Sequence, residues 1–272
     1  MLSVLGLILI LQSCTIEKKL GKQFLEQTPQ ICIQVFAPAT LYKFSHKGEK
    51  IAGFDSLTGT QQDSVLFAGS RYIKVIDDSV FLDKYVNSFI DGLRAIGFRV
   101  FIDDNVDTIL NKEPQAYVVN MSQIQLDEYI QPYDDSEQVD DSLYKMSFDL
   151  NAVDASSWFE LNKYNSPKSG KTVLYSSFTA SDGFSGNFII NGFGTKLQYR
   201  YKIDSLQMKD IYDLASYTGR QDANYLYDYF MNQFIAYNMP KDWEMLGYLH
   251  YLPSNKSFNF TEEELFEVLP DK

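Results

Sequence analysis

The chain has 272 residues and a formal net charge of −12 at pH 7; 45% of its residues are hydrophobic and 22% are charged. This is the composition of a globular protein rather than a disordered one, and the length is sufficient for one large domain with a substantial core. The charge excludes nucleic acid as an expected partner, because a phosphate backbone must be met by clustered lysine and arginine. It also argues against an electrostatic attraction to anionic lipid headgroups.

An apolar run, Leu2 to Leu11, opens the chain and ends in the sequence Leu11-Gln12-Ser13-Cys14. A helix that crosses a bilayer needs about 20 apolar residues, whereas the core of a signal peptide needs roughly 7 to 15. The run therefore indicates an export signal rather than a membrane span. An ordinary cleaved signal and a short buried strand are the alternatives.

The four residues Leu11 to Cys14 resemble the lipobox of bacterial lipoproteins, which has a branched apolar residue three before the cysteine and a small residue directly before it. The resemblance implies that residues 1–13 are a signal peptide and that Cys14 carries acyl chains, each methylene adding about 0.8 kcal/mol of membrane affinity. Thr15 after the cysteine resembles the outer-membrane class. One departure is that only Met1, with no lysine or arginine, precedes the apolar run.

Residues 14–28 are expected to be a lipid-attached tether, and residues 29–272 a single globular domain. Alternatively, Ile16, Leu20 and Phe24, spaced by four, make a short helix that packs back onto the domain. With Cys14 lipidated, Cys32 is the one remaining cysteine, so it cannot form an internal disulfide and is expected in the core.

In the first half of the domain, the clearest element is an amphipathic helix over Ser79–Ile96, which Asp77 to Ser79 can cap and Gly97 ends. A long strand over Ala116–Ile130 changes its apolar phase near Gln123, which indicates a bulge. Ser45–Gln62 is expected to be an exposed loop or a loose hairpin. Further short strands are expected over Gln30–Ala37, Leu41–Phe44, Ser64–Ala68, Arg71–Val75 and Phe98–Ile102.

In the second half, strands are expected over Tyr144–Val153, Ser156–Leu161 and Lys171–Ala180, followed by a glycine-rich turn through Gly183 and Gly186. Two helices are expected next, one from Asp204 to about Tyr217 and one from Thr218 to Pro240, because Thr218 and Gln221 have capping-box spacing. A final strand over Trp243–Leu252 and a last helix over Thr261–Leu269 complete the chain. The expected fold is α+β, with a single mixed or mostly antiparallel sheet and amphipathic helices packed on one face.

The residues for catalysis are sparse. The chain has two histidines, His46 and His250, and neither has a neighbouring carboxylate in sequence, so neither a catalytic triad nor a zinc site is indicated. The densest acidic set does not match a calcium loop and is expected to be a solvated loop between strands; its members are Asp134, Asp135, Glu137, Asp140 and Asp141. No enzyme activity, metal or cofactor is therefore expected, although a carboxylate pair in a cleft remains an alternative.

Aromatic residues are the compositional excess, with 19 tyrosines and 20 phenylalanines. Half-exposed tyrosine and tryptophan favour contacts with proteins or glycans. The candidate surface contacts are Trp158, Tyr248, His250 and Tyr251.

A second, softer resemblance is to the periplasmic auxiliary lipoproteins of envelope transport systems. It rests on the order of elements over Asp78–Gly97, Phe98–Asp104 and Gln115–Val119, and on the strand Ser156–Leu161, which presents a tryptophan. It implies a noncatalytic adaptor that bridges envelope components or handles lipid. The expected function is thus a membrane-tethered adaptor or assembly or transport accessory, held by lipid on Cys14 and binding an envelope protein. A glycan- or small-ligand-binding lipoprotein is the alternative.

Overall fold

The protein is described here from a computed structural model, which covers residues 16–49, 51–102, 110–111, 113–164, 171–191, 196–261 and 265–270. The export signal and Cys14 lie outside the described residues. None of the helices in these ranges is both long enough and apolar enough to span a membrane.

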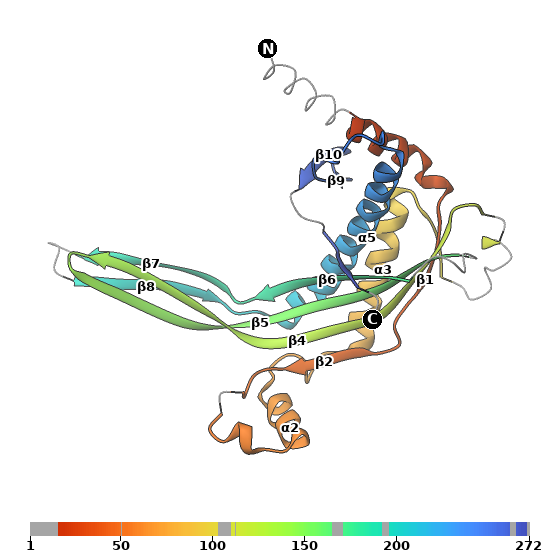
Figure 1. Cartoon of the computed structure of the whole chain (residues 1–272). Coiled ribbons are helices and arrows are strands. Elements are labelled where there is room, and N and C mark those ends of the chain that lie inside the picture. The colour runs from red at the N-terminus through yellow and green to blue at the C-terminus, as the bar shows by residue number, and fades with distance from the viewer. Residues whose placement is uncertain are drawn as a thin grey trace, which may run out of the picture.

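A mixed sheet of seven strands, counted over the described residues, forms the body of the molecule (Figure 1). Its order is β11-β6-β5-β4-β1-β3, and β2 also pairs with β4. β1, β2 and β3 make parallel pairs, whereas β4, β5, β6 and β11 pair antiparallel. The strands are β1 (Cys32–Phe36), β2 (Leu41–Ser45), β3 (Arg99–Phe101), β4 (Ala116–Val139), β5 (Ser142–Lys163), β6 (Thr172–Ser181) and β11 (Glu267–Leu269).

The two longest strands, β4 and β5, form one continuous hairpin of 24 and 22 residues. Their register shifts between Met121 and Gln123, so the bulge predicted near Gln123 is confirmed. Beyond the bulge, Ile124, Leu126 and Glu128 are buried, while the residues between them are half-exposed. One face of this part of the sheet therefore meets the helices and the other does not.

Two helices, α3 (Asp78–Ile96) and α5 (Met208–Asn238), lie side by side on one face of the sheet (Figure 1). Asp77 caps α3 by accepting hydrogen bonds from Ser79 N and Val80 N, and Gly97 ends it with φ 120°. The two helices approach closely at Gly219, where a Cβ would lie 2.3 Å from the carbonyl oxygen of Tyr85. Glycine at this position therefore permits the contact between the helices.

A second hairpin, β7 (Gly183–Asn191) and β8 (Lys196–Asp204), forms its own two-stranded sheet beside the distal half of the β4–β5 hairpin. Figure 1 shows these two hairpins projecting together from the body. We call this projection, residues 131–149, 183–191 and 196–204, the arm.

Smaller elements complete the fold. Residues 16–27 are helical and pack on the body, where Phe24 is buried. β9 (Tyr248–Leu252) and β10 (Ser257–Thr261) make a second two-stranded sheet. The remaining elements are η1 (Thr28–Gln30), η2 (Phe54–Ser56) and α2 (Gly59–Gly69).

The α+β class is confirmed, but the expectation of a single sheet is wrong, since two small sheets accompany the mixed one. The tether expected over 14–28 is also wrong from residue 16 onward, and the alternative of a packed helix is correct. Cys32 is buried, as expected, against Leu110 and Ala116.

Two strands expected between the first loop and α3 are absent. Ser64–Ala68 lies in α2, because Gln61 Oε1 accepts a hydrogen bond from Thr58 N at 3.0 Å and starts a helix. Arg71–Val75 is a turn, because the Glu128 carboxylate accepts from three consecutive backbone N–H groups, those of residues 71–73. Successive N–H groups of a strand point in opposite directions, so such an arrangement excludes a strand.

The second half of the chain differs from the expectation in several places. The glycine-rich turn is strand β7, where Gly186 makes room for the ring of Tyr199. The two helices expected before and after Thr218 form one continuous helix, α5. Gly219 does not end a helix there but permits the close contact with α3. The strand expected from Trp243 begins only at Tyr248. The last helix is wrong over Glu267–Leu269, which pair with β6 as a strand, and its capping residues 262–264 lie outside the described residues.

The acidic set is only partly a loop. Asp134, Asp135 and Glu137 lie within β4, and Asp140 and Asp141 form the turn to β5. Likewise, the two strands expected over 144–153 and 156–161 are one strand, β5, because its pairing with β4 continues through both.

We predict that Gly219→Ala destabilises the protein by about 1 to 3 kcal/mol, because the added methyl group overlaps backbone atoms of α3. Gly59→Ala is the matched control, since nothing lies within 4 Å of a Cβ at that helical position. Chemical denaturation measures both. Equal stability of the two variants would contradict the close helix contact.

Candidate interaction surface

The sheet face that points away from α3 and α5, which we call the outer face, carries the candidate Trp158. Trp158 lies on β5, and its ring centroid is 4.9 Å from that of Tyr175, its register partner on β6. Because directly paired residues share a face, the strand registers define the rest of this surface. Its other members are Tyr42, Phe44, Gln123, Gln125, Asp127, Tyr129, Asp154, Ser156, Glu160, Ser177 and Thr179.

Hydrogen bonds connect the polar side chains of the outer face. Gln123 Nε2 donates to Gln125 Oε1 at 2.8 Å, and Gln125 Nε2 donates to Asp127 Oδ2 at 2.7 Å. Asp154 Oδ1 accepts from the hydroxyls of Tyr129 and Thr179. On the outer face, amides, hydroxyls and carboxylates thus surround the Trp158–Tyr175 ring pair.

Aromatic residues also gather in the arm, between its two hairpins. Tyr133 and Phe148 on the β4–β5 hairpin contact Phe184 on β7, with ring centroids 4.3 and 4.8 Å apart. Phe148 also lies 4.6 Å from Tyr201 on β8. No described side chain of the arm is buried. The aromatic rows between the two hairpins therefore remain partly open to solvent, as does Tyr201, which is 57% exposed.

A buried polar network joins the arm to the body. Glu128 is fully buried, and its carboxylate accepts from Lys47 Nζ at 2.5 Å; Lys47 Nζ also donates to Asn151 Oδ1 at 2.7 Å. Burial raises the pKa of Glu128, but hydrogen bonds from Lys47 and from backbone N–H groups outweigh this and leave the pKa lowered.

Asp182, between β6 and β7, continues this network. Its carboxylate accepts from the backbone N–H of Asn151 at 2.8 Å and from that of Leu206 at 2.7 Å. Burial acts to raise its pKa, but these hydrogen bonds prevail and the pKa is lowered. The network fixes the point where the chain leaves the body, enters the arm and returns to α5.

The other three candidate contacts lie together on β9. Tyr251 is only 6% exposed and belongs to the core, so its expected surface role is wrong. His250 is half-buried, and its Nδ1 contacts the carboxylate of Asp228 on α5. Asp228 also accepts from Tyr251 N at 2.8 Å, and burial raises its pKa. Asn232 pairs with both backbone groups of Leu249.

These contacts give Asp228 and His250 a structural task. The side chains of α5 satisfy the backbone edge of β9, which would otherwise be an open strand edge. A histidine and the carboxylate that orients it are also two of the three members of a catalytic triad. Sequence analysis missed the Asp228–His250 pair because 22 residues separate its members.

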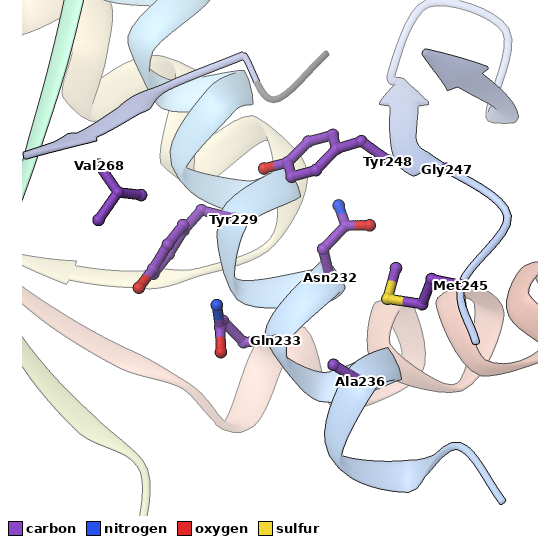
Figure 2. A pocket seen from close by; sticks show the side chains of 8 residues that line it. All are labelled: Tyr229, Asn232, Gln233, Ala236, Met245, Gly247, Tyr248 and Val268. Atoms are coloured by element: carbon purple, nitrogen blue, oxygen red, sulfur yellow. The ribbon is translucent and has the colours of Figure 1, made fainter. Parts of the chain in front are cut away.

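Tyr248 lines a pocket of about 420 Å³ between α5, β11 and the segment that leads into β9. Figure 2 shows Tyr229, Gln233 and Ala236 projecting from one side of α5, with Met245 on the opposite side of the space. This volume is within the usual range of small-ligand sites.

The second histidine, His46, is exposed beside β2. Its Nδ1 lies 2.8 Å from Glu49 and its Nε2 lies 3.4 Å from Asp127. Partial burial lowers the pKa of His46, but the hydrogen bonds to these carboxylates leave it raised. Within the described ranges, no group of three or more histidine, cysteine or acidic side chains is arranged to hold a metal ion.

Asp222 is a fully buried carboxyl group of α5 that sequence analysis did not single out. It accepts hydrogen bonds from Tyr85 Oη on α3 at 2.6 Å and from Ser176 Oγ on β6 at 2.5 Å. Burial raises its pKa to about 7. It therefore connects both helices to the sheet, in surroundings that favour its neutral form.

Neither a scan against protein-family models nor a search of curated proteins found a match to this sequence.

We predict that Asp222 makes stability depend on pH. The unfolded carboxyl releases its proton near its ordinary pKa, whereas the folded one holds it until about pH 7. The contribution of Asp222 is thus most favourable below the unfolded pKa and is lost as the pH rises toward 7. The unfolding free energy of the wild type minus that of Asp222→Asn should fall by several kcal/mol between pH 4 and pH 8. A difference that stays constant over this range would contradict the assignment.

We predict that Asp182→Ala costs about 2 to 3 kcal/mol, because the backbone N–H groups of Asn151 and Leu206 lose their acceptor. Asp204→Ala is the matched control, since the Asp204 side chain is 69% exposed and pairs only at the surface with Lys202. Denaturation measures the cost, and hydrogen exchange should rise in the arm of Asp182→Ala alone. Equal exchange in both variants would show that Asp182 does not hold the arm.

Proposed function

We propose that this protein is a lipid-anchored lipoprotein of the bacterial envelope, in the outer membrane, that acts as a noncatalytic adaptor or as an accessory to envelope assembly or transport. The lipobox resemblance of Leu11 to Cys14 supports the anchor. The outer face and the arm support the role of adaptor.

The observation that carries this proposal is the arm, which extends from the body without burying any described side chain. Isolated two-stranded hairpins are at best marginally stable. Two such hairpins, joined by half-exposed aromatic rings, gain stability if another protein covers them. Aromatic residues such as tyrosine are enriched at protein–protein interfaces, so a tyrosine-rich surface of this kind suits a partner protein.

The outer face gives the partner a surface that leads to the arm. β4 and β5 run without interruption from the Trp158–Tyr175 pair into the arm. In the arm, β7 and β8 pack against this face of the hairpin, so a partner there meets the aromatic residues at their exposed edges, as at Tyr201. An extended surface of this kind suits a protein better than a small molecule, which binds in an enclosed pocket.

A glycan is the second candidate ligand, favoured by the surroundings of Trp158. Ser156 Oγ lies 3.3 Å from Tyr175 Oη and 3.0 Å from Ser177 Oγ, so hydroxyl groups adjoin two aromatic rings. A glycan at 100 times its dissociation constant should stabilise the protein by about 2.7 kcal/mol. A thermal-shift screen with envelope glycans measures this, and Trp158→Ala should abolish the shift.

Affinity purification of the full chain from detergent-solubilised envelope tests the adaptor role. We expect a partner protein in stoichiometric amount with the wild type, and at least about a tenfold loss of it with Trp158→Ala, as for an interface anchor worth roughly 1.4 kcal/mol or more. Trp243→Ala is the control, since Trp243 lies outside the outer face and the arm, and it should retain the partner.

Recovery of the wild-type protein alone would contradict the adaptor role. Mass spectrometry of the same preparation tests the anchor separately, because an unmodified Cys14 thiol would contradict lipidation whatever partner is found.

A further inference from the structure

The helix over residues 16–27 is fastened to the body along its length. Phe24 is buried, and a Cβ on Gly21 would lie 2.9 Å from the side chain of Leu249. Glu17 Oε1 accepts a hydrogen bond from Leu246 N at 2.8 Å. Figure 1 shows this helix, in red, beside the C-terminal end of α5 and the β9–β10 hairpin. We call residues 16–27 and 237–247 the anchor end.

Cys14 is close in sequence to this helix. Two residue steps separate it from Ile16, and an extended chain spans at most roughly 7 Å over two steps. Acyl chains on Cys14 would therefore enter the bilayer close to the anchor end, whatever conformation Thr15 adopts.

The anchor end exposes side chains that suit a membrane interface. Tyr237 is 90% exposed, and Leu246 is 54% exposed. Trp243, which lies between them in sequence, is half-buried. Lys19 and Lys22 are exposed on the helix over residues 16–27. Tyrosine and tryptophan are enriched at the level of lipid headgroups, and lysine can place its stem along apolar surface while its charge stays in water.

The charge distribution also favours this orientation. Three lysines offset two glutamates in residues 16–27, and one lysine faces two acidic residues in residues 237–247, so the anchor end carries no net charge. The entire net charge of −12 therefore lies on the rest of the chain. An anionic leaflet repels the rest of the molecule but not this end.

We infer that the anchor end lies directly on the lipid surface that holds the acyl chains of Cys14, with Tyr237, Trp243 and Leu246 at the level of the headgroups. This inference rests on the lipid anchor of the proposed function. It means that the protein stands on the membrane in one orientation instead of moving on a flexible tether.

The inference also places the arm. α5 has 31 residues, so at 1.5 Å per residue it is about 46 Å long, and it runs from beside Leu206 at the base of the arm to the anchor end. The base of the arm therefore lies about one helix length from the anchor end, where a partner at a distance from the lipid can reach it.

Tryptophan quenching tests the orientation, because the chain has two tryptophans in different regions. The lipidated full chain is inserted into phosphatidylcholine vesicles with or without brominated acyl chains. In Trp158→Phe, which retains Trp243, we expect the brominated lipid to reduce the emission about twofold, because an interfacial apolar face enters the headgroup and acyl boundary by about 5–10 Å. In Trp243→Phe, which retains Trp158, we expect no change.

Three outcomes would overturn the inference. Unquenched Trp243 in vesicle-bound protein means that the anchor end stands off the membrane, although the lipid anchor itself is intact. Equal quenching of both tryptophans means that the protein does not keep this orientation. Failure of the wild type to float with vesicles contradicts the anchor, and flotation thus separates failure of the proposed function from failure of this inference.

A second variant tests the interface without altering a tryptophan position. In the Trp158→Phe background, Tyr237→Glu should reduce the quenching of Trp243 by about half or more while flotation persists, because a carboxylate opposes insertion at the headgroup level. Tyr201→Glu on the arm is the matched control and should leave the quenching unchanged. Equal quenching in both would overturn the role of Tyr237.

Discussion

The fold depends on the antiparallel ladder between β4 and β5, which continues past the bulge between Met121 and Gln123 to the end of the hairpin. Its proximal half has neighbours on both sides, because β2 pairs with β4 as far as Glu128 and β6 pairs with β5 as far as Ala152. Past these residues the same two strands continue without their neighbours and become the arm. Since each strand is a single stiff segment, the direction of the arm follows from the twist of the sheet in the body.

Two carboxyl groups are buried at the point where the body becomes the arm, and burying a charge is costly unless it is paired. Glu128 and Asp182 stand where the neighbouring strands end, and each accepts several hydrogen bonds there. These bonds lower the pKa of both carboxyl groups despite burial. The network thus replaces the strand pairing that the sheet loses at this point.

Sequence patterns predicted the parts of the fold whose signals are local. α3 has an apolar stripe and both caps, and the bulge near Gln123 appears as a change of phase. The β7–β8 hairpin of the arm was missed because its strands bury little, although Leu197, Tyr199, Tyr201 and Ile203 alternate with polar residues as β8 requires. At the candidate site, Trp158 was identified from its residue type alone. Its partner Tyr175 and the charges at the base of the arm depend on contacts distant in sequence, which no local pattern contains.

The long helix α5 connects the anchor end with the base of the arm. Its buried polar side chains make hydrogen bonds with different parts of the fold. Asp222 accepts from Tyr85 and Ser176, while Asp228 and Asn232 accept from backbone N–H groups of β9. A purely apolar stripe would allow the helix to slide or rotate with little loss, whereas directed hydrogen bonds fix one register. Because α5 is fixed along its length, the spacing between the anchor end and the base of the arm is fixed too. In the proposed arrangement, a partner bound to the arm is held at a set distance and direction from the lipid, as a bridging protein requires.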